Sequence, residues 1–304
     1  MLEFVDYRRV QLEPSIVVDR SRGEKLVIEM DITFPKVPCY LLSLDVIDIS
    51  GEHQMDLEHD ISKTRVSKEG RDLETITGQL KGDVERANLN RDPSYCGSCY
   101  GATAPESGCC NSCEEVRQAY VRKGWSFTTP TGIEQCVEEG WMDKMKEQNT
   151  EGCRIGGRVR VKKVIGNLHF SPGKSFQNNL MQIQELVPYL KDSNHHDFGH
   201  IINKFRFAAD LTSDQEASVL PKEMATRAKL GIRDPLQSVA AHTGEYFLKV
   251  VSTSFVYLNG EEIPSHQYSV TQYERDLKAG NAPGRDGHGY MISHTMMGVP
   301  GVFF

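Results

Sequence analysis

Hydrophobic and polar residues alternate most clearly between Lys25 and Phe34, where every second residue is apolar. The apolar positions are Leu26, Ile28, Met30, Ile32 and Phe34. This period of two predicts a β-strand with one buried face, ended by the prolines at 35 and 38. A second run from Tyr40 to Ser50 predicts another strand, and we expect the two strands to pair antiparallel with one face in water.

Other strands are expected later in the chain. Tyr246 to Leu258 (YFLKVVSTSFVYL) is apolar on both faces, which predicts a strand buried between two layers. Asn259-Gly260 then predicts a hairpin turn, and Gln267 to Tyr273 is the expected returning strand. Shorter strands are predicted at Ser15–Asp19, Arg158–Ile165 and Ile201–Phe207.

Helical signals gather in the middle of the chain. Glu114 to Lys123 begins with acidic residues and ends with basic ones before Gly124, which suits the helix dipole. A second short helix is predicted from Ile133 to Glu139, while Ser175 to Leu190 is ambiguous. The polar stretch from Asp210 to Asp234 predicts a loop or a short helix.

The fold class that these elements predict is mainly β, because strands dominate both ends of the chain without βαβ alternation. We expect a two-layer antiparallel β-sandwich with a small disulfide-pinned helical module. Residues 1–304 would form a single domain, and residues 92–153 the cysteine-rich helical module within it. Residues 274–289 contain many glycines and few apolar residues, which predicts a mobile loop.

Composition narrows the class of protein. A hydrophobic content of 38% and a charged content of 25% are typical of a globular chain, and the net charge of −7 argues against binding nucleic acid. No apolar run approaches the ~20 residues that span a bilayer, and no signal peptide is visible. Cysteine usage nevertheless favours an oxidising compartment. We therefore expect that targeting and anchoring segments lie outside this sequence, with Met296 to Phe304 as the approach to a lipid-facing segment.

Cysteines are concentrated in one short stretch. Five of the eight lie between Cys96 and Cys113, in the pattern CxxC, nine residues, then CCxxC. The candidate site residues are Cys96, Cys99, Cys109, Cys110, Cys113, Cys136 and Cys153. Such density indicates crosslinking, metal binding or redox chemistry.

Three interpretations of the cysteine stretch compete. Two CxxC pairs could hold tetrahedral zinc, although the spacing between them is short and other cysteines would be left over. Cys96-Gly-Ser-Cys99 resembles a redox-active motif, but a loop follows it rather than the helix that would lower a thiol pKa. We prefer structural disulfides, because this Gly-, Ser- and Pro-rich segment lacks the apolar residues to order itself.

The disulfide connectivity does not follow from the sequence. Cys39 stands apart and is interpreted as a small buried residue rather than a functional thiol. The module then holds an odd number of cysteines, so a free Cys39 would leave one of them unpaired as well. We expect neither a metal nor a cofactor.

Sequence motifs of common enzymes are absent: there is no Gly-x-Ser-x-Gly elbow, P-loop or His-Glu-x-x-His. We therefore expect that the protein is not an enzyme. The one group of histidines is His195, His196 and His200, which we interpret as part of a solvated loop, since Gly199 disfavours a helix that could present a metal site.

Several segments together carry a family resemblance. They are SRGEKLVIEMDITFPKVPC (21–39), CGSCYGATAPESGCCNSCEEVRQAYVRKGW (96–125), GNLHFSPGKSFQ (166–177), YFLKVVSTSF (246–255), QYSVT (267–271) and the terminal GVPGVFF. The chain resembles the larger, cysteine-rich subunit of the Erv/ERGIC family, whose members cycle between endoplasmic reticulum (ER) and Golgi. The CxxC–CCxxC signature is specific, because the smaller subunit of that family lacks it. Residues 175–194 match poorly.

The resemblance implies a lumenal domain of a membrane-anchored cargo receptor, carried in COPII and COPI vesicles through ER, ER–Golgi intermediate and cis-Golgi membranes. It implies a hetero-oligomer with the smaller subunit, and retrieval of escaped ER-resident proteins that lack an HDEL-type signal. It also implicates the cysteine motif in cargo binding. The alternative is a lumenal thiol–disulfide oxidoreductase or zinc module.

Histidines offer a way to make cargo binding depend on pH. The chain has ten histidines, which titrate in the range that separates Golgi from ER. Their protonation would offset the net charge of −7 and weaken repulsion of acidic cargo as the pH falls. His195, His196 and His200 are the strongest pH-sensing candidates, because neighbouring groups can couple their titrations.

Overall fold

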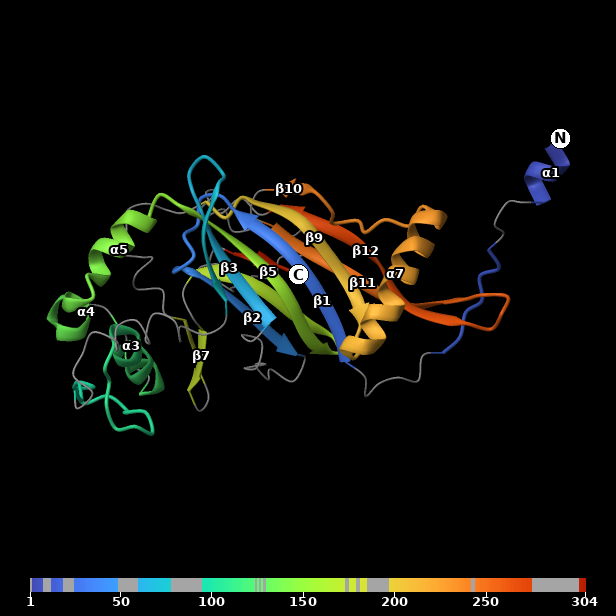
Figure 1. Cartoon of the computed structure of the whole chain (residues 1–304). Helices are drawn as coiled ribbons and strands as arrows, with labels where there is room; N and C mark the ends of the chain where they lie inside the picture. The colour runs from blue at the N-terminus through green and yellow to red at the C-terminus, as the bar shows by residue number, and fades with distance from the viewer. Residues whose placement is uncertain are drawn as a thin grey trace, which may run out of the picture.

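The computed structural model confirms the mainly β fold class (Figure 1). Its described residues are 2–7, 12–18, 25–48, 60–77, 95–123, 125, 127, 130–172, 175–178, 181–184, 197–241, 244–274 and 301–304. Within them the strands form a six-stranded sheet, a five-stranded sheet and a two-stranded hairpin. The two larger sheets form the layers of the sandwich, and Figure 1 shows the cysteine-rich helices to one side of them.

The first sheet has the order β10-β9-β1-β5-β3-β4, and every neighbouring pair in it is antiparallel. Strand β1 is central and pairs with β5 on one side and β9 on the other. The strand bounds are β1 Lys25–Phe34, β3 Ile61–Val66, β4 Asp72–Thr77, β5 Gly152–Lys162, β9 His200–Ala209 and β10 Val239–Ala241.

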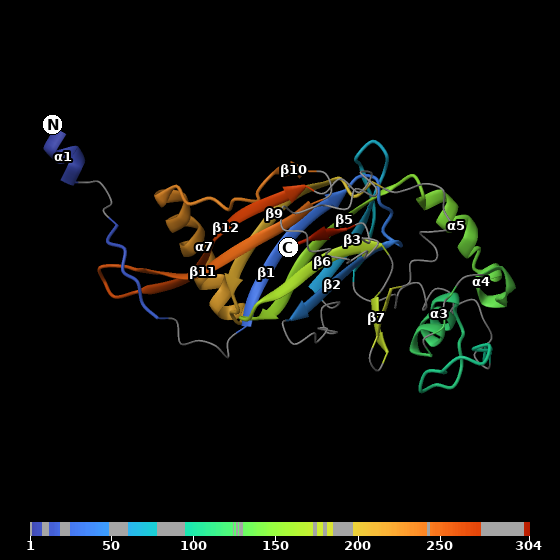
Figure 2. The same ribbon diagram turned by 180° about the vertical axis from the view of Figure 1, so that it is seen from behind.

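The second sheet has the order β12-β11-β13-β6-β2, and Figure 2 shows it from its own side. All its pairs are antiparallel except β11 with β13, which is parallel. The bounds are β2 Leu42–Asp48, β6 Gly166–Pro172, β11 Gly244–Val256, β12 Glu262–Glu274 and β13 Val302–Phe303. The hairpin is β7 Ser175–Asn178 with β8 Met181–Gln184.

The described helices lie outside the layers. Their bounds are α1 Leu2–Tyr7, α3 Cys113–Arg122, the 3₁₀ turn η2 Pro130–Gly132, α4 Glu134–Glu138, α5 Trp141–Gln148 and α7 Ser213–Leu230. The predicted helices at 114–123 and 133–139 are confirmed by α3 and α4. Within the described ranges, no helix combines the length and the apolar character needed to cross a bilayer.

The main core lies between the two sheets. Its largest fully buried side chains include Phe34, Phe170, Phe198, Phe205, Ile32 and Ile155. On the outer face of β1, Val27 and Glu29 are buried, against the prediction of a wet face, while Asp31 and Thr33 are half-buried and Lys25 is exposed. Helix α7 places Glu216 on Arg158 and Glu223 on Arg206. It begins at a capping box on Thr212 and ends at Gly231, whose φ of 69° is a left-handed conformation that glycine adopts at little cost.

The predicted pairing of the first two strands is wrong. Strand β1 lies in one sheet and β2 in the other, where β2 pairs with β6. The turn that holds Pro35 and Pro38 carries the chain across the sandwich between them, so neighbours in sequence become opposite layers. The strand predicted at residues 15–19 is also absent, since residues 12–18 have no regular structure.

Strand β11 was expected to be buried on both faces, and this expectation is wrong as well. Phe247 is 59% exposed and Val251 is 61% exposed, because no third layer covers that face within the described chain. The hairpin at Asn259-Gly260 and the returning strand β12 are confirmed. The predicted mobile loop 274–289 lies outside the described residues after Glu274, and so do His195 and His196.

Two carboxylates of β1, the buried Glu29 and the half-buried Asp31, set the expected response to acid. Burial by itself raises the pKa of Glu29, but Lys204, Arg206 and Arg158 outweigh it and hold that pKa below its usual range. Burial also raises the pKa of Asp31, but hydrogen bonds from the Arg154 guanidinium and the Asn203 amide outweigh burial and lower that pKa. A carboxyl whose pKa is lower in the folded state than in the unfolded state stabilises the fold at any pH above its unfolded-state pKa. That stabilisation is lost as the pH falls through the folded-state pKa.

We therefore expect the free energy of unfolding to change little through these groups down to about pH 5, and to fall below about pH 4. The Asp31→Asn variant should show a shallower acid loss in urea titrations followed by far-UV circular dichroism. Glu147→Gln, at an exposed position of α5, is the matched control. An acid midpoint of Asp31→Asn identical to that of wild type would contradict the assignment.

Candidate functional site

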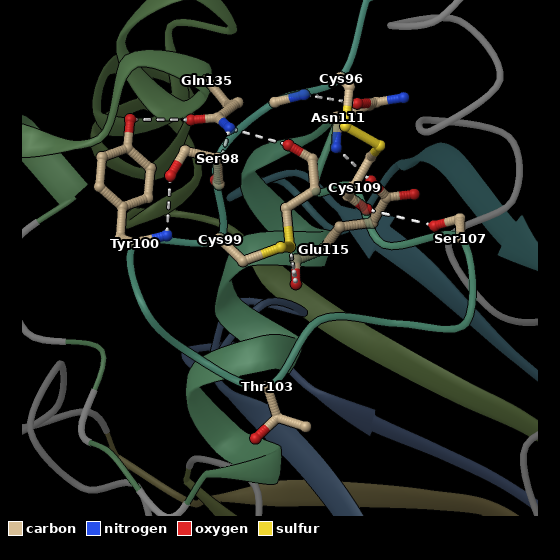
Figure 3. The surroundings of a disulfide bond; sticks show 12 residues. Cys96, Ser98, Cys99, Tyr100, Thr103, Ser107, Cys109, Asn111, Glu115 and Gln135 are labelled. Atoms are coloured by element: carbon tan, nitrogen blue, oxygen red, sulfur yellow. Dashed lines mark hydrogen bonds between the residues drawn. A yellow bond between two sulfur atoms is a disulfide. The ribbon is translucent and has the colours of Figure 1, made fainter.

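All eight cysteines form disulfides. Three bridges crosslink the residues that we call the cysteine-rich module, the described part of 95–150: Cys96–Cys109, Cys99–Cys110 and Cys113–Cys136. The first two bridges tie the CxxC segment to the adjacent cysteines 109 and 110, and Figure 3 shows their surroundings with Cys96, Cys99 and Cys109 labelled. The sulfur atoms are thus paired in disulfides, as the preferred interpretation predicts.

Cys39 and Cys153 correct the expected grouping of the cysteines. They pair with each other, so Cys39 is not a free thiol and Cys153 belongs to the sandwich rather than to the module. The register of β1 with β5 places Cys153 opposite Phe34, and the turn after Phe34 brings Cys39 back within 4.8 Å, Cα to Cα. The pairing depends on that cross-strand register, which the sequence alone did not give.

The crossed pairing bears on the two chemical alternatives. A thioredoxin-like motif joins its own two cysteines, whereas Cys96 and Cys99 each bond to a different partner, and residues 95–99 are not helical. A disulfide sulfur is not the thiolate that binds zinc. Among the residues that the structure describes, no group of three or more His, Cys, Asp or Glu could hold a metal ion.

Gln135 organises the loop around the bridges, and the sequence analysis did not identify it. Its side chain is almost completely buried, and its amide nitrogen donates to the carbonyl oxygens of Ser98 at 3.0 Å and Cys110 at 2.8 Å. The Tyr100 hydroxyl donates to the Gln135 side-chain oxygen and accepts from the backbone N–H of Glu134, as Figure 3 shows in part. The only sequence signal for this role is a polar residue on the buried face of a short helix.

Gly97 lets two segments of this loop, around residues 97 and 110, approach closely. A Cβ at this position would lie 2.2 Å from the Cys110 carbonyl oxygen and 2.6 Å from the Gln135 amide nitrogen. The Gly97 oxygen instead accepts from the Cys110 N–H at 3.0 Å, and its N–H donates to the Asn111 side chain at 2.9 Å. Glycine in the CGSC motif is therefore explained by packing rather than by catalysis.

Helix α3 starts at Cys113, separated by two residues from the adjacent cysteines, and side chains accept from the amides at and just before its first turn. The Glu115 carboxylate accepts from the backbone N–H groups of Asn111 and Ser112, and the Ser112 hydroxyl accepts from the Glu115 N–H. Glu139 accepts from the N–H of Cys113 at 3.0 Å, which links α3 to the chain after α4. A carboxylate at a helix N-terminus also complements the helix dipole.

The module has a core of its own, separate from that of the sandwich. The members are Cys110, Cys113, Val116, Ala119, Phe127, Ile133 and Cys136. A row of ring contacts runs from Trp125 through Tyr120 and Phe127 to Trp141, with centroids 5.6–5.8 Å apart. Both tryptophans of the chain lie in this row. So small a core leaves the three disulfides as a major source of order.

Apolar side chains also reach the surface of the module. Trp125 is 42% exposed and has the Lys123 ammonium 4.0 Å above its ring, and Val137 is 61% exposed. Met142 on α5 is exposed as well. Exposed aromatic and methionine side chains are typical of protein-binding surfaces.

His200 is the one predicted pH-sensing histidine within the described residues, and it is not in a solvated loop. It starts β9 and is 2% exposed, with its ring nitrogens near the Phe198 carbonyl at 3.1 Å and the Tyr246 hydroxyl at 2.8 Å. Its ring also contacts Phe34 and Tyr246 in the main core. His200 therefore cannot touch a partner directly.

Comparisons with known proteins agree with these features. The profile of the family described as "Endoplasmic reticulum vesicle transporter" matches residues 99–304, and that of "Endoplasmic Reticulum-Golgi Intermediate Compartment (ERGIC)" matches residues 1–55. The chain is 41% identical to "Probable endoplasmic reticulum-Golgi intermediate compartment protein 3" of Dictyostelium discoideum, over 98% of this chain and 72% of that protein. It is 36% identical to "ER-derived vesicles protein ERV46" of Saccharomyces cerevisiae, over 99% of this chain and 76% of that protein.

Among solved structures, the crystal structure of Erv41p matches with a TM-score of 0.42 and 18% identity, over 95% of this chain and 91% of that chain. A likeness at this level supports no inference about partners. The family profile and the two relatives, by contrast, cover most of the sequence, including the cysteine-rich module. The chain therefore belongs to the endoplasmic reticulum vesicle transporter family, whose members are proteins of ER–Golgi vesicle transport.

Proposed function

We propose that this chain is the lumenal, cargo-binding part of a receptor that cycles between ER and Golgi and retrieves escaped ER-resident proteins lacking an HDEL-type signal. The observation that carries the proposal is the cysteine-rich module, a rigid crosslinked unit beside the sandwich that presents apolar side chains. Family membership supports the vesicle-transport role.

The setting of the proposal is the oxidising lumen. Disulfides persist there and are rare in the cytosol, so four bridges in one chain suit a lumenal location. In the full-length protein we propose membrane anchoring and a hetero-oligomer with a smaller Erv/ERGIC-family subunit, carried in COPII and COPI vesicles. The relatives' printed names place them in ER-derived vesicles and the ER–Golgi intermediate compartment.

The three exposed apolar side chains of the module allow a direct test. The variant Trp125→Ala, Val137→Ser, Met142→Ser should bind a purified signal-less ER resident roughly tenfold or more weakly than wild type, because truncating aromatic anchors removes much of an interface's free energy. Binding is measured by surface plasmon resonance.

The matched control is Val256→Ser with Leu258→Ser, which removes still more exposed apolar groups from the tip of the β11–β12 hairpin. Its affinity should equal that of wild type. Unchanged binding of the module variant, or equal losses in both variants, would contradict a cargo site on the module.

We further propose that binding is tighter in the Golgi than in the ER because histidines are protonated there. The buried position of His200 leaves His195 and His196 as the candidates. Affinity for the same cargo should be higher at about pH 6 than at about pH 7.2, and His195→Gln with His196→Gln should reduce that difference. Equal wild-type affinity at both pH values would exclude a switch in this chain. A double variant with full pH dependence would clear these two residues.

A further inference from the structure

Strand β13 fills only a small part of the space between its two neighbours. Its two residues pair with β6 at Phe170 and His169, and Phe303 also pairs with Glu245 of β11. Phe304 extends the ladder on the β6 side by exchanging backbone hydrogen bonds with Leu168, at 2.8 and 3.0 Å. Because β13 touches both neighbours at once, β11 and β6 stand one strand apart at this point.

Beyond β13 the edge of β11 has no neighbouring strand within the described chain. Strand β11 pairs with β12 along its whole length, Gly244–Val256, but its other side contacts β13 at a single residue pair. An unpaired edge presents a row of backbone N–H and C=O groups that lack protein partners. The edge that remains starts at Phe247.

A groove of about 1200 Å³ opens at the same place. It reaches between the two sheets, so that β1 of the first sheet lies behind the opening between β11 and β6 in Figure 2. Apolar side chains from both layers line it: Leu26, Ile28, Phe205, Phe207, Leu168 and Val250. The groove therefore combines an apolar floor with an open backbone edge.

These two properties identify the kind of occupant. An acyl chain would cover the apolar floor but could not hydrogen-bond to the backbone edge, whereas an extended polypeptide does both. The register continues without a shift: the position after Phe304 falls opposite Asn167 of β6 and beside Phe247 of β11. Val302 and Phe304 pack into the main core, while Phe303 points away and stacks on His169. The second and fourth positions past Phe304 would then face the groove.

We propose that the groove is the acceptor for an apolar, alternating β-strand that continues β13 past Phe304 in the same chain, parallel to β11 and antiparallel to β6. Both relatives are longer than the region they share with this chain, so extra chain exists in the family. Such a strand closes the second sheet and seals the core. This inference is independent of the proposed cargo site.

The test extends the chain at Phe304 by six residues. Thr-Val-Thr-Val-Thr-Val places valine toward the groove, and the matched control Val-Thr-Val-Thr-Val-Thr has the same composition with valine facing out. Hydrogen exchange is followed by mass spectrometry. The first extension should slow exchange in β11 from Phe247 to Val251 by roughly tenfold or more, since one net hydrogen bond shifts an opening equilibrium by about that factor. The control should not.

A blocking variant distinguishes binding in the groove from nonspecific association of the extension elsewhere on the protein. Val250→Asp, which puts a charge on the groove wall, should abolish the protection, while Val256→Asp on the same strand outside the groove should leave it intact. Equal protection by both extensions, or none by either, would overturn the proposal. Protection by the free Thr-Val peptide without any effect of the fused one would show an acceptor for another chain and overturn the intrachain strand.

Discussion

Replacing Cys113 and Cys136 with alanine is expected to unfold the cysteine-rich module and to leave the β-sandwich folded. Both sulfur atoms are buried in the module's small core, and the bridge joins α3 to α4 across 23 residues. Removing such a crosslink costs roughly 2–4 kcal/mol, and the seven-member core has little else to offset the loss.

Two spectroscopic signals separate the parts of the molecule. Both tryptophans, Trp125 and Trp141, lie in the module, so tryptophan fluorescence reports on it, while far-UV circular dichroism also follows the strands and helix α7 of the sandwich. In urea the double variant should lose its fluorescence transition, or shift it strongly downward, with the circular dichroism transition preserved. Cys39→Ala with Cys153→Ala is the control that should act on the circular dichroism transition instead. A normal fluorescence transition in the first variant would contradict the assigned role of the bridge.

Glu223→Ala is expected to destabilise the sandwich by roughly 3–5 kcal/mol, because it leaves a buried guanidinium without its main partner. Glu223 accepts from Arg206 and from the Ser265 hydroxyl, and Ser265 in turn accepts from Arg227. Side chains of Arg206 and Glu223 are 6% and 5% exposed, so water cannot replace the lost contacts.

Helix α7 supplies its own control. Glu216→Ala removes a carboxylate that pairs with Arg158 at a more exposed position, and such pairs contribute about 1 kcal/mol or less. Urea midpoints followed by circular dichroism should therefore fall much further for Glu223→Ala than for Glu216→Ala. Similar midpoints for the two variants would show that the buried network does not hold α7 on the sheet. Glu223→Gln, which keeps one acceptor oxygen and replaces the other with an amide NH₂ group, should lie between them.

Local elements were predictable, whereas their partners were not. The alternation that gives β1, the Asn259-Gly260 turn and the charged ends of α3 are all encoded within a few residues. Pairing depends on contacts between distant segments, and so β2 was assigned to the wrong neighbour. Helix α7 was missed as a long helix because its outward face is polar and Pro221, a residue that usually breaks helices, lies inside it. The buried pair of Glu223 with Arg206 that holds it is invisible in the pattern.

In the candidate site, too, local features were predictable and contacts between distant segments were not. Clustered cysteines identified the module, but the crossed pairing depends on how the loop 95–110 folds. The Cys39–Cys153 bridge depends on the register of β1 with β5. A histidine beside other histidines predicted a wet switch, yet His200 is buried because it starts β9 and its ring packs on Phe34 and Tyr246 in the main core. Gln135 gave no signal at all, since a single polar residue in a short helix is ordinarily a surface residue.

The Cys39–Cys153 bridge also determines how the protein would carry a mechanical load. It closes a covalent loop of 114 residues in sequence, and the module lies within that loop. Tension applied to the module by a bound protein can draw out the chain between the two cysteines and no more, because beyond them the pull passes through a sulfur–sulfur bond. Strand β1 and the strands that follow β5 are then shielded from unzipping. A protease cut between the two cysteines would likewise leave one covalent molecule until a reductant separates the pieces.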